Sequence, residues 1–88
     1  MIRQRIHFFG NVQGVGFRYT TCSMARGFAV TGFVRNRSNG SVELAVEGES
    51  DEVERFLESL RERMGNHIDR EETITEPASG TFGGFGIR

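Results

Sequence analysis

The dipeptide Asn39-Gly40 lies between two stretches of the chain that have strand character. Residues 30–36 precede it, and after it Val42, Leu44 and Val46 alternate with other residues. An Asn-Gly pair suits the central positions of a type I′ turn, which joins two antiparallel strands closely. The sequence therefore predicts a β-hairpin, and a sheet built on this hairpin needs a second layer to cover its apolar face.

Two helices are predicted to supply that layer. The first covers residues 17–26, with Gly27 as its C-terminal stop. The second has Ser50 as its expected N-cap and ends at Gly65. The residues at helical spacing are Phe17, Thr21, Met24 and Phe28 around the first helix, and Val53, Phe56, Leu57, Leu60 and Met64 in the second.

Three further stretches are predicted to be strands: residues 2–9, 68–75 and 81–87. The resulting order is strand, helix, strand, strand, helix, strand, strand. This order predicts an α+β, ferredoxin-like two-layer sandwich with a βαββαβ core, in which two helices pack on one face of a mainly antiparallel sheet of four to five strands. We expect residues 1–88 to form a single domain, because half of so short a chain could not bury a core of its own.

Cysteine content and hydropathy limit the cellular setting. Cys22 is the only cysteine, so no intramolecular disulfide can form, and a reducing compartment is favoured. The N-terminus lacks the apolar segment of a signal peptide, and no apolar run approaches the roughly 18 residues that span a bilayer. We expect a monomeric cytoplasmic protein with no membrane partner.

All 11 basic residues are arginine, and they are unevenly distributed. Residues 1–42 contain six arginines and no acid (+6), whereas residues 43–88 contain five arginines and all 12 acids (−7), which together give the net charge of −1. A guanidinium suits bidentate binding of phosphate or carboxylate. The absence of lysine excludes Schiff-base chemistry and a P-loop lysine. A compact anion site therefore fits better than a nucleic-acid surface.

The connection between the first strand and the first helix contains Gly10, Gly14 and Gly16 within seven residues. Such glycines allow successive backbone N–H groups to turn inward and form an anion-binding nest. The helix N-terminus that follows adds its unpaired N–H groups, and Arg18 lies within reach of the same anion. This predicts a phosphate cradle that needs no metal ion. On local composition alone, a glycine-rich turn with a surface arginine is the simpler interpretation.

Two stretches closely resemble the two signature motifs of the acylphosphatases: GNVQGVGFR (residues 10–18) and GFVRNRSNGSV (residues 32–42). The terminal FGI (residues 85–87) also resembles the end of the chain in that family. The resemblance covers essentially the whole chain. It implies an enzyme that hydrolyses the carboxyl–phosphate bond of a small-molecule acyl phosphate without a cofactor or metal. Arg18 is then the catalytic arginine that binds phosphate, and Asn36 is the catalytic residue that positions the attacking water. The implied phosphate-binding loop consists of Gln13, Gly14, Val15, Gly16, Phe17 and Arg18.

The reaction that the resemblance implies needs mainly positioning of the reactants and stabilisation of charge, because an acyl phosphate carries a good leaving group. An amide such as that of Asn36 is too weak a base to deprotonate water. The implied scheme is therefore substrate-assisted, with the proton going to the phosphate of the substrate. Asn39 and Asn11 depart from the family pattern. Asn39 suits the hairpin turn as well as the frequent Asp does, whereas Asn11 removes a positive charge that is frequent at the mouth of the cradle.

Two other functions are compatible with the same fold. One is a non-catalytic phosphate- or carbamoyl-phosphate-binding module, like the acylphosphatase-like domain of the hydrogenase-maturation carbamoyltransferase. We expect this chain to be complete at 88 residues, and it lacks the zinc-finger cysteines of such proteins. The other is an RNA-binding ferredoxin-like domain, which would need exposed aromatic residues on central strands and a basic face.

Several residues remain without an assigned chemical role. Cys22, His7 and His67 have neither the number nor the spacing of a zinc site, and a Cys–His nucleophilic pair is disfavoured. Arg35 and Arg37 flank Asn36 and are expected to raise the local positive potential, which would attract the anionic substrate. The acyl group of the substrate is not specified by any motif, so acetyl, carbamoyl and glyceroyl phosphates are not distinguished. Four glycines near the C-terminus predict a flexible or bulged edge: Gly80, Gly83, Gly84 and Gly86.

Overall fold

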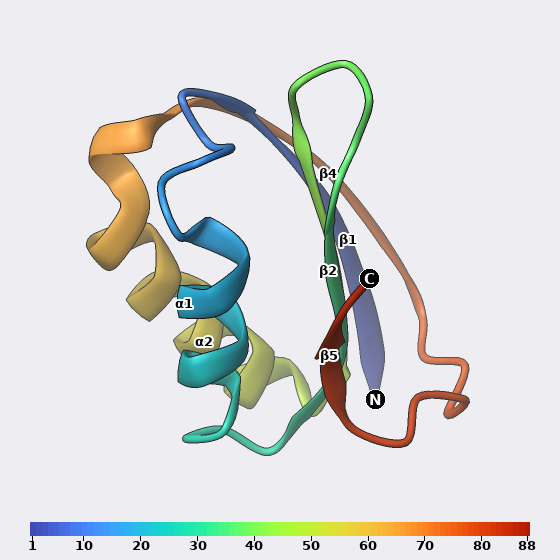
Figure 1. Ribbon diagram of the computed structural model, residues 1–88. Coiled ribbons are helices and arrows are strands. Elements are labelled where there is room, and N and C mark those ends of the chain that lie inside the picture. Colours follow the sequence, from blue (N-terminus) through green and yellow to red (C-terminus); the bar gives the residue numbers. More distant parts are fainter.

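The computed structural model describes all residues from Met1 to Arg88 and places two helices on one face of a five-stranded sheet (Figure 1). This confirms the predicted ferredoxin-like sandwich. The elements in chain order are β1 (Ile2–Gly10), α1 (Phe17–Ala25), β2 (Val30–Asn36), β3 (Val42–Gly48), α2 (Ser50–Met64), a short 3-10 turn (Gly65–His67), β4 (Ile68–Pro77) and β5 (Phe85–Ile87).

The strands lie in the order β4-β1-β3-β2-β5. Neighbouring strands are antiparallel except β5, which runs parallel to β2, so the sheet is mixed at one edge only. In this register Val34 of β2 lies opposite Ile87 of β5. The end of the chain is thereby brought beside the end of β2, where Asn36 lies.

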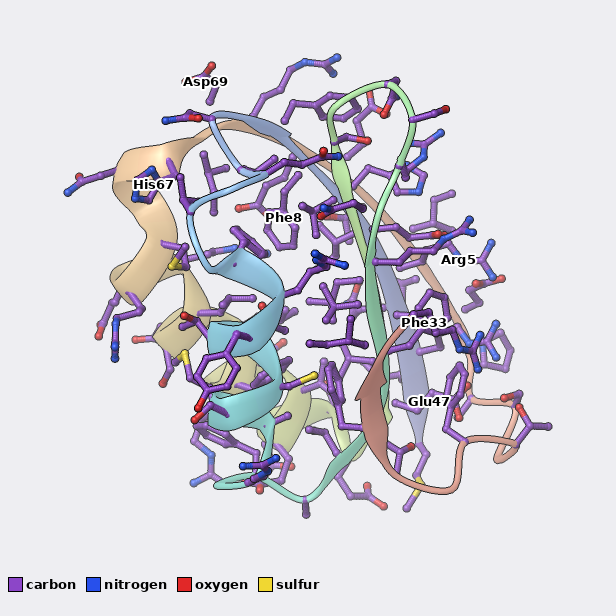
Figure 2. All side chains as sticks on the ribbon, viewed as in Figure 1. Arg5, Phe8, Phe33, Glu47, His67 and Asp69 are labelled. Carbon is purple, nitrogen blue, oxygen red and sulfur yellow. The ribbon has the colours of Figure 1, made fainter.

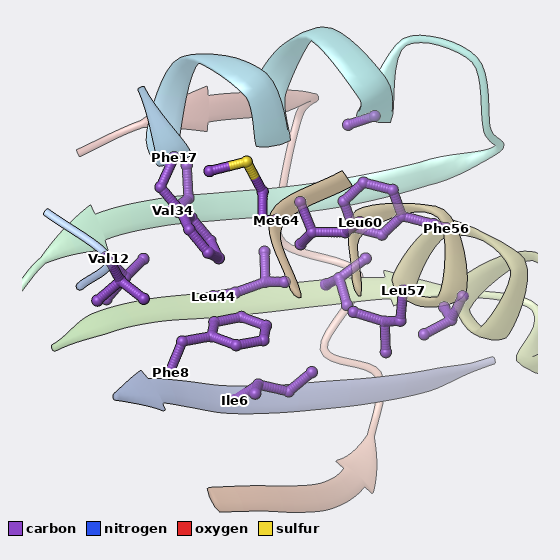
Figure 3. Packing of buried hydrophobic residues seen from close by; sticks show 14 residues of the cluster. Ile6, Phe8, Val12, Phe17, Val34, Leu44, Phe56, Leu57, Leu60 and Met64 are labelled. Atoms are coloured by element: carbon purple, nitrogen blue, oxygen red, sulfur yellow. The ribbon is translucent and has the colours of Figure 1, made fainter. Parts of the chain in front are cut away.

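The hydrophobic core fills the space between the sheet and the two helices (Figure 3). It forms because alternate residues of β1 and β3 face the helices, as their spacing predicts. The apolar stripe of α2 packs on these residues, and Phe17 of α1 lies against Phe8 of β1 with the ring centroids 5.1 Å apart. The buried cluster comprises Ile6, Phe8, Val12, Phe17, Ala25, Val34, Val42, Leu44, Val46, Val53, Phe56, Leu57, Leu60 and Met64.

The opposite face of the sheet carries charges in cross-strand pairs. Figure 2 shows Arg5 and Glu47 on this side, away from the helices. Arg3 of β1 bonds Glu47 of β3 at 2.8 Å, and Arg5 lies 3.2 Å from Glu76 of β4. The basic strand β1 therefore lies between two acidic strands. This arrangement explains how a chain with one basic and one acidic half folds without charge repulsion.

Some predicted boundaries need correction. α1 ends at Ala25, with Arg26 as its C-cap, and α2 begins at Ser50, so Glu49 is the N-cap and no side chain caps that helix. The last strand is only Phe85–Ile87 rather than residues 81–87. The connection before it includes Gly80, whose φ of +70° suits glycine.

An apolar side chain at a strand position, such as Phe33, is expected from the sequence to belong to the core, but Phe33 does not. Its ring lies on the face without helices, where it packs edge-on against Phe82 with the centroids 5.8 Å apart. The guanidinium of Arg88 lies 4.2 Å from the centre of the Phe33 ring. Residues near the C-terminus thus cover this aromatic side chain on the outer face.

Neither α1 nor α2 combines the length and the apolar character that a helix needs to cross a membrane.

Candidate active site

The loop between β1 and α1 turns sharply because two of its glycines adopt left-handed conformations. Gly14 has φ +77° and Gly16, the N-cap of α1, has φ +79°. The first helical bond runs from the N–H of Thr20 to the carbonyl of Gly16 at 2.9 Å. The N–H groups that precede Thr20 in the first turn therefore have no helical acceptor. Since this turn contains no acidic side chain, its positive end is free to bind an anion.

Gln13 connects this loop to the β2–β3 hairpin. Its side-chain Nε2 donates to the backbone carbonyls of Arg37 at 2.8 Å and of Ser41 at 2.9 Å. The hairpin itself is held by Asn39, whose Oδ1 accepts hydrogen bonds from the N–H and the hydroxyl of Ser41. The asparagine at position 39 thus provides the acceptor that stabilises the turn. Gln13 holds the loop against the hairpin that follows Asn36.

A pocket of about 220 Å³ lies where the loop, α1 and the end of β2 meet. Arg18, in the first turn of α1, and Asn36, the last residue of β2, both line it. The guanidinium of Arg18 has no ion pair or hydrogen bond within the chain, and its pocket contains no acid. The lining residues are Val12, Gly14, Gly16, Phe17, Arg18, Tyr19, Asn36 and Ile87.

Two of the predicted loop residues lie outside this pocket. Val15 packs against the hydrophobic core, and the side chain of Gln13 is directed to the hairpin carbonyls. Their backbone groups remain part of the loop. The structure places their side chains in supporting positions rather than on the pocket surface.

Three pocket residues were not predicted from the sequence: Val12, Tyr19 and Ile87. Val12 is fully buried, whereas Tyr19 is 74% exposed and lies at the rim. Tyr19 could have been predicted to line the pocket, because it directly follows Arg18 on α1. Ile87 comes from the far end of the chain, and only the parallel pairing of β5 with β2 brings it to the pocket.

The expected role of Arg35 in attracting substrate is not supported by its position. Arg35 is on the face without helices, where its Nε donates to Glu43. Burial raises the pKa of Glu43, but hydrogen bonds and charge from Arg35 and His7 outweigh this and lower it overall. The charge of Arg35 is therefore balanced by a carboxylate. Arg37 has no acidic partner, and its Nη1 lies 3.4 Å from the hydroxyl of Ser41.

Cys22 lies on α1 and is partly buried against the core. Burial raises the pKa of the Cys22 thiol, and the charge of Arg26 offsets this only in part. A thiol with a raised pKa is a poor nucleophile at neutral pH. His7 lies 3.5 Å from Glu43 on the other face of the sheet. No three His, Cys, Asp or Glu side chains gather into a group that could hold a metal ion.

Comparison with known proteins assigns the chain to a family. Residues 4–87 match the family model Acylphosphatase. The chain belongs to the acylphosphatase family. An acylphosphatase from Yersinia pseudotuberculosis is 42% identical over 85 residues, which cover 93% of this chain and 90% of that protein. The family and the hydrolytic activity on acyl phosphates that the two motifs implied are thereby confirmed.

Solved structures agree with this assignment. The crystal structure of acylphosphatase from Bacillus subtilis superposes with a TM-score of 0.88 at 29% identity and covers 100% of this chain and 99% of that one. The crystal structure of HypF from T. kodakarensis matches with a TM-score of 0.85 at 32% identity, but this chain corresponds to only 12% of it. The same acylphosphatase fold therefore also occurs as a small part of a much larger protein.

Proposed function

We propose that this acylphosphatase hydrolyses its substrate in the pocket between the loop of residues 13–18 and the end of β2, without a metal ion. The observation that carries the proposal is that Arg18, with no internal partner, and Asn36 line one pocket at the N-terminus of α1. The products are a carboxylate and inorganic phosphate.

The phosphoryl group binds to the backbone N–H groups of the loop and of the first turn of α1. Left-handed Gly14 and Gly16 aim this backbone at the anion. Arg18 adds a planar fork that can hold two phosphoryl oxygens. Because these donors are already in place, their attraction strengthens as negative charge accumulates on the phosphoryl oxygens during the reaction.

Asn36 holds the attacking water. The side-chain carbonyl accepts one hydrogen bond from the water, which directs an oxygen lone pair at phosphorus. The bond from water oxygen to phosphorus forms while the bond from phosphorus to the acyl oxygen breaks. The proton of the water goes to a phosphoryl oxygen, and the acyl oxygen leaves as a carboxylate, which needs no general acid.

The test is release of inorganic phosphate from benzoyl phosphate. We expect Arg18→Ala to lower kcat/KM by at least about 10²–10³-fold, the usual effect of removing one preorganised donor. Asn36→Ala is expected to lower kcat while leaving phosphate inhibition unchanged. Arg63→Ala is the matched control, because Arg63 is an exposed arginine outside the pocket.

Two results would contradict the proposal. Wild-type turnover by Arg18→Ala or by Asn36→Ala would remove these residues from the mechanism. Loss of activity in EDTA, restored by a divalent metal, would show that a metal ion takes part. Unchanged circular dichroism and thermal midpoint in each variant will show that the fold is retained.

The alternative of a non-catalytic phosphate-binding module is distinguished by the same assay. Such a module would bind phosphate through Arg18 but release none from benzoyl phosphate. An RNA-binding role is less compatible with the open sheet face, because Arg3, Arg5 and Arg35 are each paired with a glutamate there. We further propose that the chain is a single-domain, monomeric, cytoplasmic enzyme. Light scattering after gel filtration and localisation of a tagged protein test these points.

A further inference from the structure

A second cavity lies along α1, next to the pocket that Arg18 and Asn36 line. It has a volume of about 230 Å³ and lies between α1 and β5, which pack against each other. Tyr19 and Ile87 line both this cavity and the phosphate pocket, so the two share a wall. The residues that line the second cavity are Tyr19, Cys22, Ser23, Arg26, Phe85, Gly86 and Ile87.

We call these two adjacent cavities together the groove, and each of them is lined by an arginine on the same side of α1. Arg18, Cys22 and Arg26 are spaced by four residues, which places them one above another. With a rise of 1.5 Å per residue, the backbone positions of Arg18 and Arg26 are about 12 Å apart. Arg26 is exposed and has no ion pair or hydrogen bond to a side chain, and no acid lines either cavity.

We propose that the acyl group of the substrate lies in this groove and that Arg26 binds a second anionic group at the far end of the acyl chain. The inference rests on the proposed function, because it takes the phosphoryl group to be held at Arg18. The side chains of Tyr19, Phe85 and Ile87 offer apolar contact to the body of the acyl group. The substrate class is then an acyl phosphate whose acyl part carries a distal carboxylate or phosphate.

A rigid pair of substrates tests this assignment. In 4-carboxybenzoyl phosphate a carboxylate points away from the phosphoryl group, and the corresponding methyl ester has a similar shape without the charge. An exposed ion pair is worth up to about five-fold in an equilibrium constant. We therefore expect the wild-type kcat/KM to be about five-fold higher for the carboxylate than for the ester.

The matched variants are Arg26→Gln and Arg63→Gln, which remove the same charge inside and outside the groove. We expect Arg26→Gln to abolish the preference for the carboxylate, chiefly through KM. Arg63→Gln should retain the preference. The inference is overturned if Arg26→Gln changes both substrates equally or neither, while benzoyl phosphate is still hydrolysed through Arg18. A 4-phosphonobenzoyl phosphate arm shows whether the distal anion is carboxylate or phosphate.

Binding without turnover separates this inference from the proposed function. If no acyl phosphate is hydrolysed, the proposed function fails. The groove is then judged by the dissociation constants of 4-carboxybenzylphosphonate and benzylphosphonate. Tighter binding of the carboxylated compound that disappears in Arg26→Gln supports the groove, and equal binding of the two compounds overturns it.

Discussion

The side-chain amide of Gln13 donates a hydrogen bond of 2.8 Å to the backbone carbonyl of Arg37. Gln13 directly precedes Gly14 in the proposed phosphate loop, and Arg37 directly follows Asn36. This bond therefore sets the spacing between the groups proposed to hold phosphate and the side chain proposed to hold water. It connects two segments that are far apart in the sequence at the point where their separation matters for catalysis.

We predict that Gln13→Ala lowers kcat by about 10- to 100-fold, because a small misplacement of reacting groups is costly. The KM should change less, since Arg18 and the loop amides remain. Gln13→Glu should be at least as harmful, because a carboxylate would face the two carbonyls that the amide now contacts. Steady-state kinetics with benzoyl phosphate will separate kcat from KM.

The control for this prediction is Gln4→Ala. Gln4 is also partly buried, and its Oε1 accepts a hydrogen bond from Thr75 at the β1–β4 edge of the sheet. That substitution should leave kcat within about two-fold, as a surface change away from the site usually does. Wild-type kcat in Gln13→Ala would show that the loop holds its position without this side chain.

A second prediction concerns the glycines of β2 and the phosphate loop. Nothing lies within 4 Å of a Cβ placed on Gly16, so Gly16→Ala adds only the strain of a left-handed alanine, about 1–2 kcal/mol. At Gly32, with φ +149°, a Cβ would lie 1.8 Å from the carbonyl oxygen of Ala45 in β3. Gly32→Ala should therefore cost at least about 3 kcal/mol.

Urea unfolding of the two variants measures these differences. Gly83→Ala is the reference, since Gly83 has no positive φ and a Cβ at this position would meet no atom within 4 Å. We expect that change to alter the free energy of unfolding by less than about 0.5 kcal/mol. Equal effects at Gly16 and Gly32 would mean that β2 and β3 move apart readily.

The sequence was most informative where local patterns determine structure. The hairpin at Asn39-Gly40 and the stripe of α2 depend on residues close in the chain, and both were predicted correctly. The turn type was not, because Asn39 has no positive φ, which a type I′ turn with Asn39-Gly40 at its centre requires. The start of β5 was not, because Thr81 and Phe82 fit a strand as well as Phe85 does, and only pairing with β2 decides which residues join the sheet. Phe33 was misplaced because its neighbour Val34 is also apolar, and the sequence does not show which of the two faces the helices.

The residues of the candidate site also fall into two groups: those that the sequence indicated and those that only the fold reveals. Arg18 and Asn36 lie in motifs that resemble those of a known family, so the sequence already singled out both of these pocket-lining residues. Ile87 was missed because its place beside Asn36 depends on a parallel strand pair at the sheet edge. Arg35 was given a steering role because the sequence does not reveal that Glu43 lies opposite it in β3.

A third prediction concerns Cys22. Burial raises the pKa of this thiol, so it should be protonated at neutral pH and inactive as a nucleophile. Cys22→Ser should therefore keep kcat/KM for acetyl phosphate within about two-fold. Acetyl phosphate is the appropriate substrate because its small acyl group does not extend along the groove that Cys22 lines. A loss of activity comparable to that of Arg18→Ala would place the thiol in the reaction.

The last prediction concerns Glu47, a carboxylate that is only 3% exposed on β3. Its oxygens accept hydrogen bonds from the N–H and hydroxyl of Ser79, from the N–H of Gly80 at 2.9 Å, and from Arg3. Burial alone would raise the pKa of Glu47, but these donors outweigh it and lower the pKa from 4.5 to about 2. The charged form is therefore favoured by folding.

A lowered pKa in the folded state stabilises the protein above the pKa of the unfolded state, and this contribution is lost as the pH falls from 4.5 towards 2. We expect it to be on the order of 2 kcal/mol. Glu47→Gln should thus lower the free energy of unfolding at pH 7, and the difference from wild type should shrink as the pH approaches 2. Urea titrations across this range will measure it, with Glu58→Gln on the exposed side of α2 as the control.

The same variant should also affect the candidate active-site pocket, because Ser79 and Gly80 belong to the connection that leads into β5. With one acceptor oxygen of residue 47 replaced by an amide donor, the anchor of this connection on β3 is weakened, and β5 depends more on its short pairing with β2. We expect amide exchange of residues 79–88 to increase in Glu47→Gln at pH 7, while exchange in α2 stays at the wild-type rate. Since Ile87 forms one wall of the pocket, KM for benzoyl phosphate should rise with it. Faster exchange that is uniform over the whole chain would instead indicate a general loss of stability, and would separate Glu47 from the positioning of β5.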